Sequence, residues 1–208
     1  MEAYRTVCGY GTGEIVEKKS RFIAEVFPVV SGDEVSGHIE KIKKEYWDAR
    51  HHCWAYVIGQ NPGTERMSDD GEPAGTAGKP ILEVIRGRGL TDVLIVVTRY
   101  FGGTLLGAGN LTRAYGKAAR LALVDAGKAV MSPCKVLSLT VDYGLYGKAA
   151  YILPQFNIKT LDEAFTDAVT LTLLIRADRA ERFAAEIREM SAGKTEPEVV
   201  EERFCEME

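Results

Sequence analysis

Residues 92–123, DVLIVVTRYFGGTLLGAGNLTRAYGKAARLAL, contain the strongest indications of the fold. Their first part, within Thr91–Phe101, has the continuous apolar core typical of a central strand that is buried on both faces. A glycine-rich segment follows, and apolar residues then recur at helical spacing to about Asp125. The order is therefore strand, glycine loop and helix, with Asn110 as the expected N-cap of the helix.

The same stretch has the pattern of a phosphate site. Backbone N–H groups of a glycine-rich turn that leads into a helix N-terminus can converge on an anion, aided by the helix dipole. Arg113, Lys117 and Arg120 follow at i, i+4 and i+7, on one side of the expected helix. The alternative is that the glycines permit close packing and the cations form a solvated face. The stretch matches neither the Walker motif nor the dinucleotide-binding fingerprint, which argues against both classes of enzyme.

Glycine and basic charge are concentrated around this stretch. Thirteen of the 21 glycines lie between Gly59 and Gly127, and only three follow Gly127. Residues 79–120 hold seven Lys or Arg and two acidic residues, although the whole chain of 208 residues has a net charge of −4. Residues 1–132 carry a net charge of +1 and residues 133–208 a net charge of −5. We therefore expect two parts that are built differently, the first suited to a phosphate-bearing partner.

The residues before the glycine-rich stretch predict two strands, a helix and a long loop. Ser20–Val30 is apolar and β-prone, and His52–Gly59 reads as a second strand. Between them, Ser31 and Glu34 form a capping box that opens a helix. Asn61–Pro80 is rich in turn residues, so we expect it to lack regular structure.

That loop contains three carboxylates within four consecutive residues, those of Asp69, Asp70 and Glu72. Such a cluster could hold Mg²⁺ together with water, and a metal beside a basic phosphate site would indicate phosphoryl chemistry. The alternative is a turn in which the aspartates accept hydrogen bonds from nearby backbone. No further ligand can be placed from the sequence, so we predict neither a metal nor a cofactor.

His51, His52 and Cys53 adjoin in ARHHCWAYVIG, residues 49–59. On a strand, His51 and Cys53 share one side and His52 takes the other, which argues against one metal site that uses all three. A Cys–His nucleophile also requires an orienting group that adjacency does not supply. We expect residues packed in the core or at its rim. His52 stays a candidate ligand contact.

The sequence predicts neither a membrane span nor a secretory signal. No run approaches the roughly 18–20 apolar residues that a membrane span requires, and the N-terminal residues have neither a basic start nor an apolar segment. The four cysteines, Cys8, Cys53, Cys134 and Cys205, form no C-x-x-C pair, so we expect them to be reduced and structural. The expected location is the cytoplasm.

After Ser132 and Pro133 the pattern changes to six elements in the order βαββαβ, which is ferredoxin-like. The second expected helix is opened by Asp178 with Glu181. The other expected elements are the strands Lys135–Tyr143, Phe156–Leu161, Ala168–Arg176 and Glu198–Phe204 and the helix Leu145–Leu153. We therefore predict an α+β protein with a first domain of residues 1–132 and a second of residues 133–208.

Three motifs, in this order and spacing, closely resemble the YigZ/IMPACT family. They are ARHHCWAYVIG, SDDGEPAGTAGKPILEVI and the stretch of residues 92–123. The resemblance is strong over about residues 15–130, and residues 132–204 are similar to the small C-terminal domain of bacterial YigZ-type members. Two positions depart from the family, because Ala74 stands where Ser or Gly is common and Asn110 where Gly is frequent.

The resemblance implies an N-terminal domain related in fold to RNase PH, GHMP kinases and elongation factor G domain IV, with a left-handed βαβ crossover. It implies a C-terminal domain similar to elongation factor G domain V. The eukaryotic relative regulates translation, and for YigZ-type members the resemblance implies binding of nucleic acid or of the translation machinery, with no established reaction. It carries Arg99, Gly102, Gly103, Arg113 and Lys117 over as site residues.

Three hypotheses of function follow, and we expect the first. It is a binding protein, rather than an enzyme, that engages structured RNA, the ribosome or a translation factor in a role regulating translation, and it has no catalytic residue. The second is a metal-dependent enzyme acting on a phosphorylated small molecule, and the third is a protein-interaction module. The sequence indicates no oligomeric state. The site expected for the first is Arg99, Gly102, Gly103, Asn110, Arg113, Lys117 and Arg120, with His52, Asp69, Asp70 and Glu72 as a secondary set.

Overall fold

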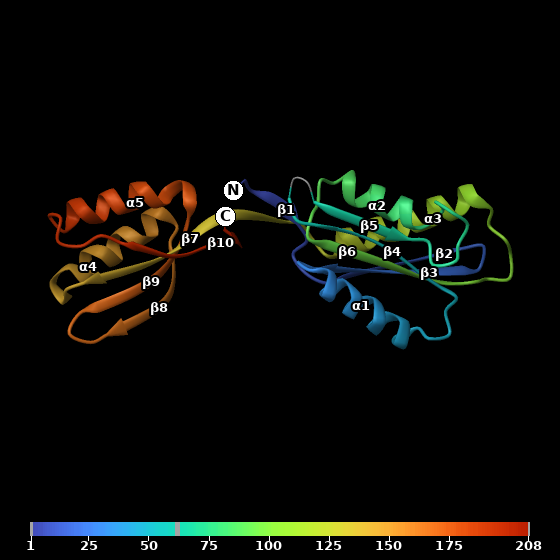
Figure 1. Ribbon diagram of the computed structural model, residues 1–208, viewed down its shortest axis with the longest axis horizontal. Helices are drawn as coiled ribbons and strands as arrows, with labels where there is room; N and C mark the ends of the chain where they lie inside the picture. Colours follow the sequence, from blue (N-terminus) through green and yellow to red (C-terminus); the bar gives the residue numbers. More distant parts are fainter. Residues whose placement is uncertain (1, 61–62, 208) are drawn as a thin grey trace. The chain divides into compact units, whose positions relative to one another are not determined.

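The chain divides into two compact units in the computed structural model, which describes residues 2–60 and 63–207 (Figure 1). The first unit is Tyr4–Val130, and the second is Met131–Glu208 together with Met1–Ala3. The division falls inside the strand β7 (Ala129–Val141), which also contains the predicted boundary between residues 132 and 133. Each unit combines helices with an antiparallel sheet, so the prediction of a two-domain α+β protein is confirmed.

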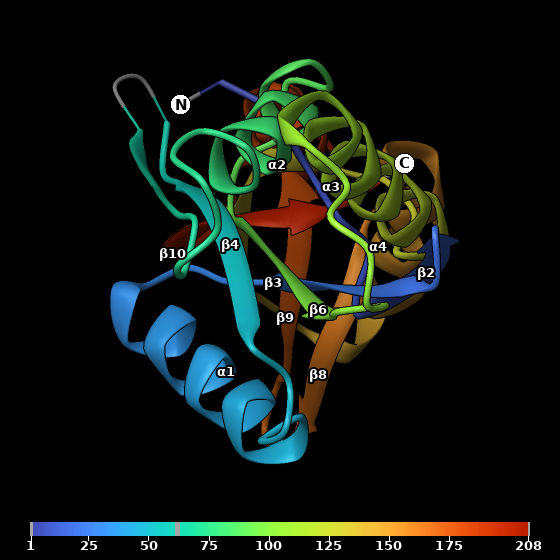
Figure 2. The ribbon, with the colours of Figure 1, turned by 90° about the vertical axis from the view of Figure 1, so that its right-hand side faces the viewer.

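The first unit is a five-stranded sheet with helices on both faces (Figures 1 and 2). The helix α1 (Gly32–Glu45) covers one face, and α2 (Gly78–Arg86) and α3 (Ala108–Asp125) cover the other. The short strand β1 (Tyr4–Thr6) pairs with β7. The order of the sheet is β2 (Gly11–Glu17), β3 (Ser20–Pro28), β6 (Val93–Tyr100), β4 (His51–Ile58) and β5 (Thr64–Ser68).

The strand β6 lies at the centre of this sheet, between β3 and β4, as its apolar sequence predicts. All its residues but Tyr100 are buried. Val93, Ile95 and Val97 belong to the core beneath α2 and α3, whereas the alternate residues face α1. The period of two along a strand therefore supplies both cores of the unit.

The capping prediction at α1 is confirmed, and the one at α3 is wrong. The Glu34 backbone N–H donates to Ser31 Oγ over 3.2 Å. In contrast, α3 begins at Ala108 after Gly107, which has a φ of +75°. This left-handed conformation, which favours glycine, turns the chain three residues before Asn110. Asn110 lies in the first turn, and its side-chain amide donates to the Leu106 carbonyl over 2.8 Å.

The expectation that Asn61–Pro80 lacks regular structure is wrong for Thr64–Ser68 and for Gly78–Pro80, which begin α2, and it is confirmed for residues 69–77, which form turns and bends. Asn61 and Pro62 lie outside the described residues. Thr64–Ser68 forms β5, which pairs with β4 so that Arg66 lies opposite Tyr56. The sequence TERMS has no apolar alternation because β5 is an edge strand whose side chains are mostly exposed. Backbone pairing with β4 forms this strand, and local sequence does not predict such pairing.

The second unit has the predicted βαββαβ order and is ferredoxin-like. Leu139 and Leu171 of the sheet and Phe183 and Ile187 of the second helix are fully buried in its core. Its strands β7, β9 and β8 lie side by side in this order, and β10 pairs with β7, as does β1. The elements after β7 are α4 (Tyr143–Ile152), the 3₁₀ helix η1 (Leu153–Phe156), β8 (Lys159–Phe165), β9 (Val169–Arg176), α5 (Ala177–Met190) and β10 (Glu198–Glu206).

Asp178 is not the cap of α5. The strand β9 ends at Arg176 and α5 begins at the next residue, so no loop separates them. Asp178 therefore lies in the first turn of the helix, where its carboxylate pairs with the Arg176 guanidinium at 2.9 Å.

Cys134 of β7 and Cys205 of β10 form a disulfide bond, with their Cα atoms 6.3 Å apart. The expectation that all four cysteines are reduced is therefore wrong for these two, and Cys8 and Cys53 are free. The sequence pattern does not indicate this pair, because the two cysteines are 71 positions apart. Antiparallel pairing of the two strands, with Cys134 opposite Arg203, brings them together.

None of the helices in the described part of the chain is long and apolar enough to span a membrane.

Candidate functional site

A groove of about 660 Å³ lies between α2 and α3. Pro80 and Val84 of α2 and Gly116 of α3 are the buried residues of its lining and are called its floor, so the floor carries no charged side chain. Gly75 and Gly87, at the two ends of α2, also line it without adding bulk. The groove is therefore a concave, largely apolar surface of the size of a ligand site.

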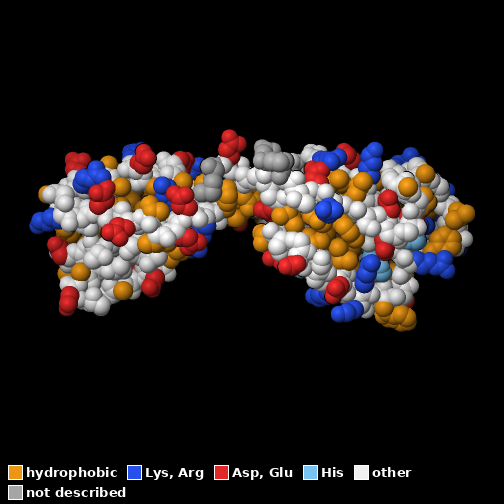
Figure 3. Space-filling view, viewed as in Figure 1, with side chains coloured by type: hydrophobic (Ala, Val, Ile, Leu, Met, Phe, Trp, Pro, Cys, Tyr) orange, Lys and Arg blue, Asp and Glu red, His pale blue; other side chains and the backbone are white. Residues whose placement is uncertain are grey.

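Basic side chains surround this floor. Arg113 and Arg120 come from α3, Lys79 comes from the first turn of α2, and Arg88 comes from the turn that follows α2. The space-filling view shows Lys and Arg side chains along the edge of the first unit where α2 and α3 lie, at its top (Figure 3). Glu83 adds one carboxylate to the lining. The groove therefore favours an anionic ligand.

The predicted cations of α3 are only partly brought together. Arg113 and Arg120, seven residues apart and thus about 10 Å apart along the helix, both line the groove. Lys117 is exposed on the same helix but is not among the lining residues. Asn110 does not line the groove either, but its Oδ1 accepts a hydrogen bond from Arg113 Nη2 at 2.6 Å and so orients that guanidinium.

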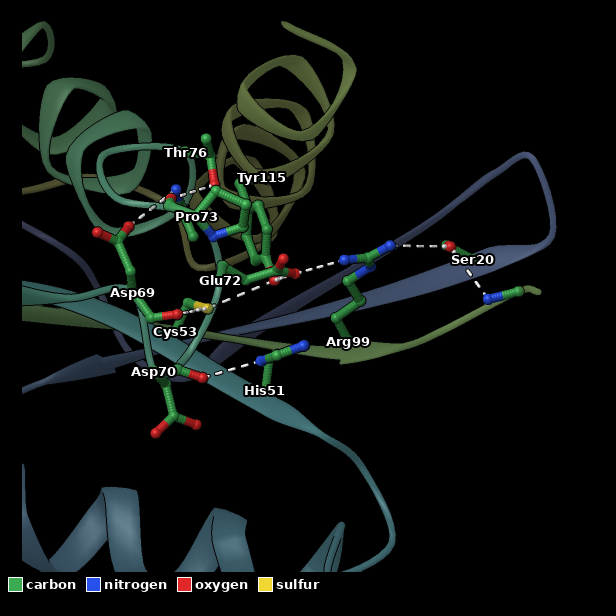
Figure 4. A network of polar contacts seen from close by, with 12 residues as sticks. Ser20, His51, Cys53, Asp69, Asp70, Glu72, Pro73, Thr76, Arg99 and Tyr115 are labelled. Carbon is green, nitrogen blue, oxygen red and sulfur yellow. Dashed lines mark hydrogen bonds and ion pairs between the residues drawn. The ribbon is translucent and has the colours of Figure 1, made fainter. Parts of the chain in front are cut away.

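Arg99 lies in a buried polar network instead (Figure 4). It is 5% exposed, and its Nη1 donates to Glu72 Oε1 over 2.6 Å. The Tyr115 hydroxyl of α3 donates to the same carboxylate oxygen over 2.7 Å. On the other side, Ser20 Oγ accepts hydrogen bonds from Arg99 Nη2 at 3.4 Å and from the Gly102 backbone N–H at 3.1 Å. Arg99 thus joins the acidic loop to the glycine loop.

These contacts exclude Arg99 from the surface at which a phosphate would bind. Gly102 is required for close packing, because a Cβ atom there would lie 2.1 Å from the Lys19 carbonyl carbon. Gly103 has a φ of +83°, which a glycine adopts without strain. Both glycines shape the loop that precedes α3, and neither lines the groove.

The three clustered carboxylates are engaged within the protein. The Asp69 carboxylate accepts hydrogen bonds from the backbone N–H groups of Gly75, Ala77 and Gly78, at 2.8–3.0 Å, and so holds the N-terminus of α2. Asp70 Oδ2 accepts from the His52 backbone N–H at 2.7 Å. Glu72 pairs with Arg99, as described above.

This arrangement supports the interpretation of the acidic segment as a turn. Among residues 2–60 and 63–207, no three or more His, Cys, Asp or Glu side chains are placed to hold a metal ion together. The metal-dependent enzyme hypothesis therefore loses the ligand set on which it was based.

His52 and Cys53 are buried and lie away from the groove. His52 Nε2 lies 3.1 Å from the Tyr46 carbonyl oxygen, on the side of the sheet that α1 covers. The Cys53 thiol, on the opposite side, donates to the Asp69 carbonyl over 3.0 Å. Burial raises the pKa of Cys53 to about 12, so the thiol stays protonated at neutral pH. Neither residue has the setting of a nucleophile or of a ligand contact.

We expect Asp69→Asn to lower the free energy of unfolding by about 1–3 kcal/mol, because an amide NH₂ would face a backbone N–H that now donates to an oxygen. Burial raises the pKa of the Asp69 carboxyl, but the three N–H groups outweigh it and leave the pKa below its ordinary value. The stabilisation is therefore present above the ordinary Asp pKa, about 3.9, and is lost as the pH falls through the lowered value. Urea unfolding at pH 7 measures the change.

Asp33→Asn is the matched control, because Asp33 is exposed in the first turn of α1. It should lower the free energy of unfolding by less than about 1 kcal/mol. Equal losses in the two variants would contradict the anchoring role of Asp69.

Comparisons with known proteins cover both units. Residues 18–123 match the family described as Impact N-terminal domain, and residues 139–194 match a domain of unknown function, DUF1949. The IMPACT family member YvyE of Bacillus subtilis (strain 168) is 38% identical over 196 residues, which are 94% of this chain and 90% of that protein. The IMPACT family member YigZ of Escherichia coli (strain K12) is 34% identical over 187 residues, 89% of this chain and 92% of that protein.

A solved structure described as that of an hypothetical protein is also similar. It has 32% sequence identity and a TM-score of 0.64, and the match covers 97% of this chain and 98% of that chain. The similarity therefore extends over both units and the strand β7 that passes from one to the other.

Proposed function

The chain belongs to the IMPACT family, and from this premise we propose that its α2–α3 groove binds RNA of the translation machinery as part of a role in regulating translation. The observation that supports the proposal most is the placement of Lys79, Arg88, Arg113 and Arg120 around one concave surface. Cations contribute to RNA binding by neutralising phosphates and releasing counterions. The partner implies a location in the cytoplasm, where ribosomes are.

The other cations of the basic segment explain why the groove, rather than the whole segment, is the proposed contact. Arg86 is engaged by Glu65 and Glu83, and Arg99 is buried against Glu72. Asn110 takes part by orienting Arg113, and Lys117 lies beside the groove, where a long RNA would also reach it. Gly102 and Gly103 fix the loop that positions these side chains.

We expect Arg113→Ala/Arg120→Ala to weaken the binding of a structured RNA and to reduce the slope of log K against log salt by about 2, close to 1 for each phosphate contact removed. The measurement is a titration of an RNA hairpin, at several salt concentrations, with the wild type and the variant. Both arginines are exposed, so the fold should be unaffected.

Lys41→Ala/Lys44→Ala is the matched control. It removes the same charge from α1, on the opposite face of the sheet. Its salt slope should equal that of the wild type. Binding that does not depend on salt, or equal affinities of the two double variants, would rule out the groove as the RNA contact.

A further inference from the structure

The groove has a shape that binding to a phosphate backbone does not require. A backbone needs a row of cations, and any exposed helix face can carry one. In this protein the cations stand around a hollow of about 660 Å³ with an apolar floor. That volume lies within the range of small-ligand sites, about 300–1,000 Å³. The hollow therefore has room for a planar, uncharged group beside the phosphate.

The floor is kept open at Gly116. This residue lies within α3, where glycine is less favourable than alanine by about 1 kcal/mol. The atoms nearest to a Cβ atom at this position would be those of the Arg120 guanidinium, the first of them 3.5 Å away. Close packing of backbone therefore does not explain the glycine. The missing side chain leaves space next to Pro80 and Val84, and the Arg120 guanidinium, at the end of an exposed and flexible side chain, lies beside it.

The charged groups around the hollow are of two kinds. Arg113 and Arg120 present guanidinium groups, whose planar array of donors suits phosphate oxygens. Glu83 lines the groove from α2 and also accepts a hydrogen bond from Arg86 Nη1 at 3.0 Å; a carboxylate can accept further hydrogen bonds but repels phosphate. A ligand that satisfies both has a phosphate at one side and hydroxyl or amino donors at the other. A nucleotide has this distribution of groups.

We propose that the groove binds a single nucleotide unit, with its phosphate on Arg113 and Arg120 and its base on the floor formed by Pro80, Val84 and Gly116. The proposal rests on the proposed function and specifies it, because such a unit in RNA must be unpaired. A free nucleotide presents the same chemistry, so the experiment tests both sources.

The probes are the four nucleoside 5′-monophosphates, ribose 5-phosphate and an RNA duplex without unpaired residues, each titrated into the full chain by calorimetry. We expect at least one nucleoside monophosphate to bind about tenfold or more tightly than ribose 5-phosphate, because a stacked base contributes about 1–3 kcal/mol. Equal affinities for nucleotides and ribose 5-phosphate would overturn the proposal.

Gly116→Leu separates shape from charge. The leucine fills the floor and keeps every cation of the groove, although it moves the Arg120 guanidinium away from Gly116, so Arg120→Ala is measured beside it. We expect it to weaken nucleotide binding at least tenfold and to leave salt-dependent binding of the duplex within about twofold of the wild type. Unchanged nucleotide affinity in this variant would overturn the proposal.

Lys117→Ala is the control on the same helix, because Lys117 is exposed but does not line the groove. Its nucleotide affinity should stay within about twofold of the wild type, whereas the nucleotide affinity of Arg120→Ala should be at least tenfold lower. Duplex binding that needs Arg113 and Arg120, without binding of any monophosphate, would refute the nucleotide unit and leave the proposed function standing. Nucleotide binding without RNA binding would refute the proposed function and assign the groove to a free nucleotide.

Discussion

Replacing Arg99 with methionine should lower the free energy of unfolding of the first unit by about 3–5 kcal/mol, one of the two largest effects expected in the chain. The substitution leaves the Glu72 carboxylate buried, with the Tyr115 hydroxyl still donating to it but no cation beside it. It also removes a hydrogen bond to Ser20, the residue that holds the glycine loop at Gly102. Urea unfolding followed by tryptophan fluorescence isolates this unit, because both tryptophans lie in it.

The exposed pair of Arg21 and Glu14 supplies the control. Its nearest nitrogen–oxygen distance, 2.7 Å, resembles the 2.6 Å between Arg99 and Glu72, but the two side chains are 51% and 43% exposed. Arg21→Met should therefore change the free energy of unfolding by no more than about 1 kcal/mol. Tyr115→Phe removes one hydrogen bond to Glu72. It should lower the free energy of unfolding by an amount between the losses in Arg21→Met and Arg99→Met. Similar losses in Arg99→Met and Arg21→Met would show that burial of the Arg99–Glu72 pair does not increase its contribution to the free energy of unfolding.

The second large effect is expected at the other end of the chain. Cys134→Ser should lower the free energy of unfolding of the second unit by about 4 kcal/mol in the absence of reductant. The chain-entropy model gives this value because the bond closes a long loop, since Cys134 and Cys205 are 71 positions apart in the sequence. The loss is measured as the unfolding transition that circular dichroism detects and tryptophan fluorescence does not.

Two comparisons make this prediction specific. The wild type in the presence of reductant should unfold like Cys134→Ser without it, because reduction removes the same constraint. Cys8→Ser should have no such effect, since Cys8 is exposed and free. If the wild type and Cys134→Ser unfold at the same urea concentration under oxidising conditions, the bond does not stabilise the second unit.

The predictable part of the fold is the part encoded by local patterns. The apolar run around Val93–Tyr100 predicts the central strand because burial on both faces demands apolar residues at every position. The strand β5 gives no such signal, since it is exposed and forms only by pairing with β4. The disulfide is equally non-local, because β7 and β10 are the first and last elements of the second unit and are brought together only by their pairing in the sheet.

The candidate site also has one part that local sequence indicates and another part that depends on packing. The spacing of Arg113 and Arg120 on one helix is a local signal, whereas Lys79 and Arg88 join them only because α2 packs beside α3. In the basic segment Arg99 looks like any other cation. Its position in the strand is the missed signal, because it shares a strand face with Val97 and so points into the core, where a cation needs a buried partner.

The outer strand β10 also affects how the protein behaves at high concentration. β10 pairs with β7, and most of its side chains are exposed, so few buried contacts hold it in place apart from the ladder and the disulfide. If β10 detached, the backbone groups of residues 131–138 that it covers would be open to a strand from another molecule. The bond between Cys134 and Cys205 therefore acts against strand exchange and aggregation, and the solubility of the chain should follow the redox state of its solvent.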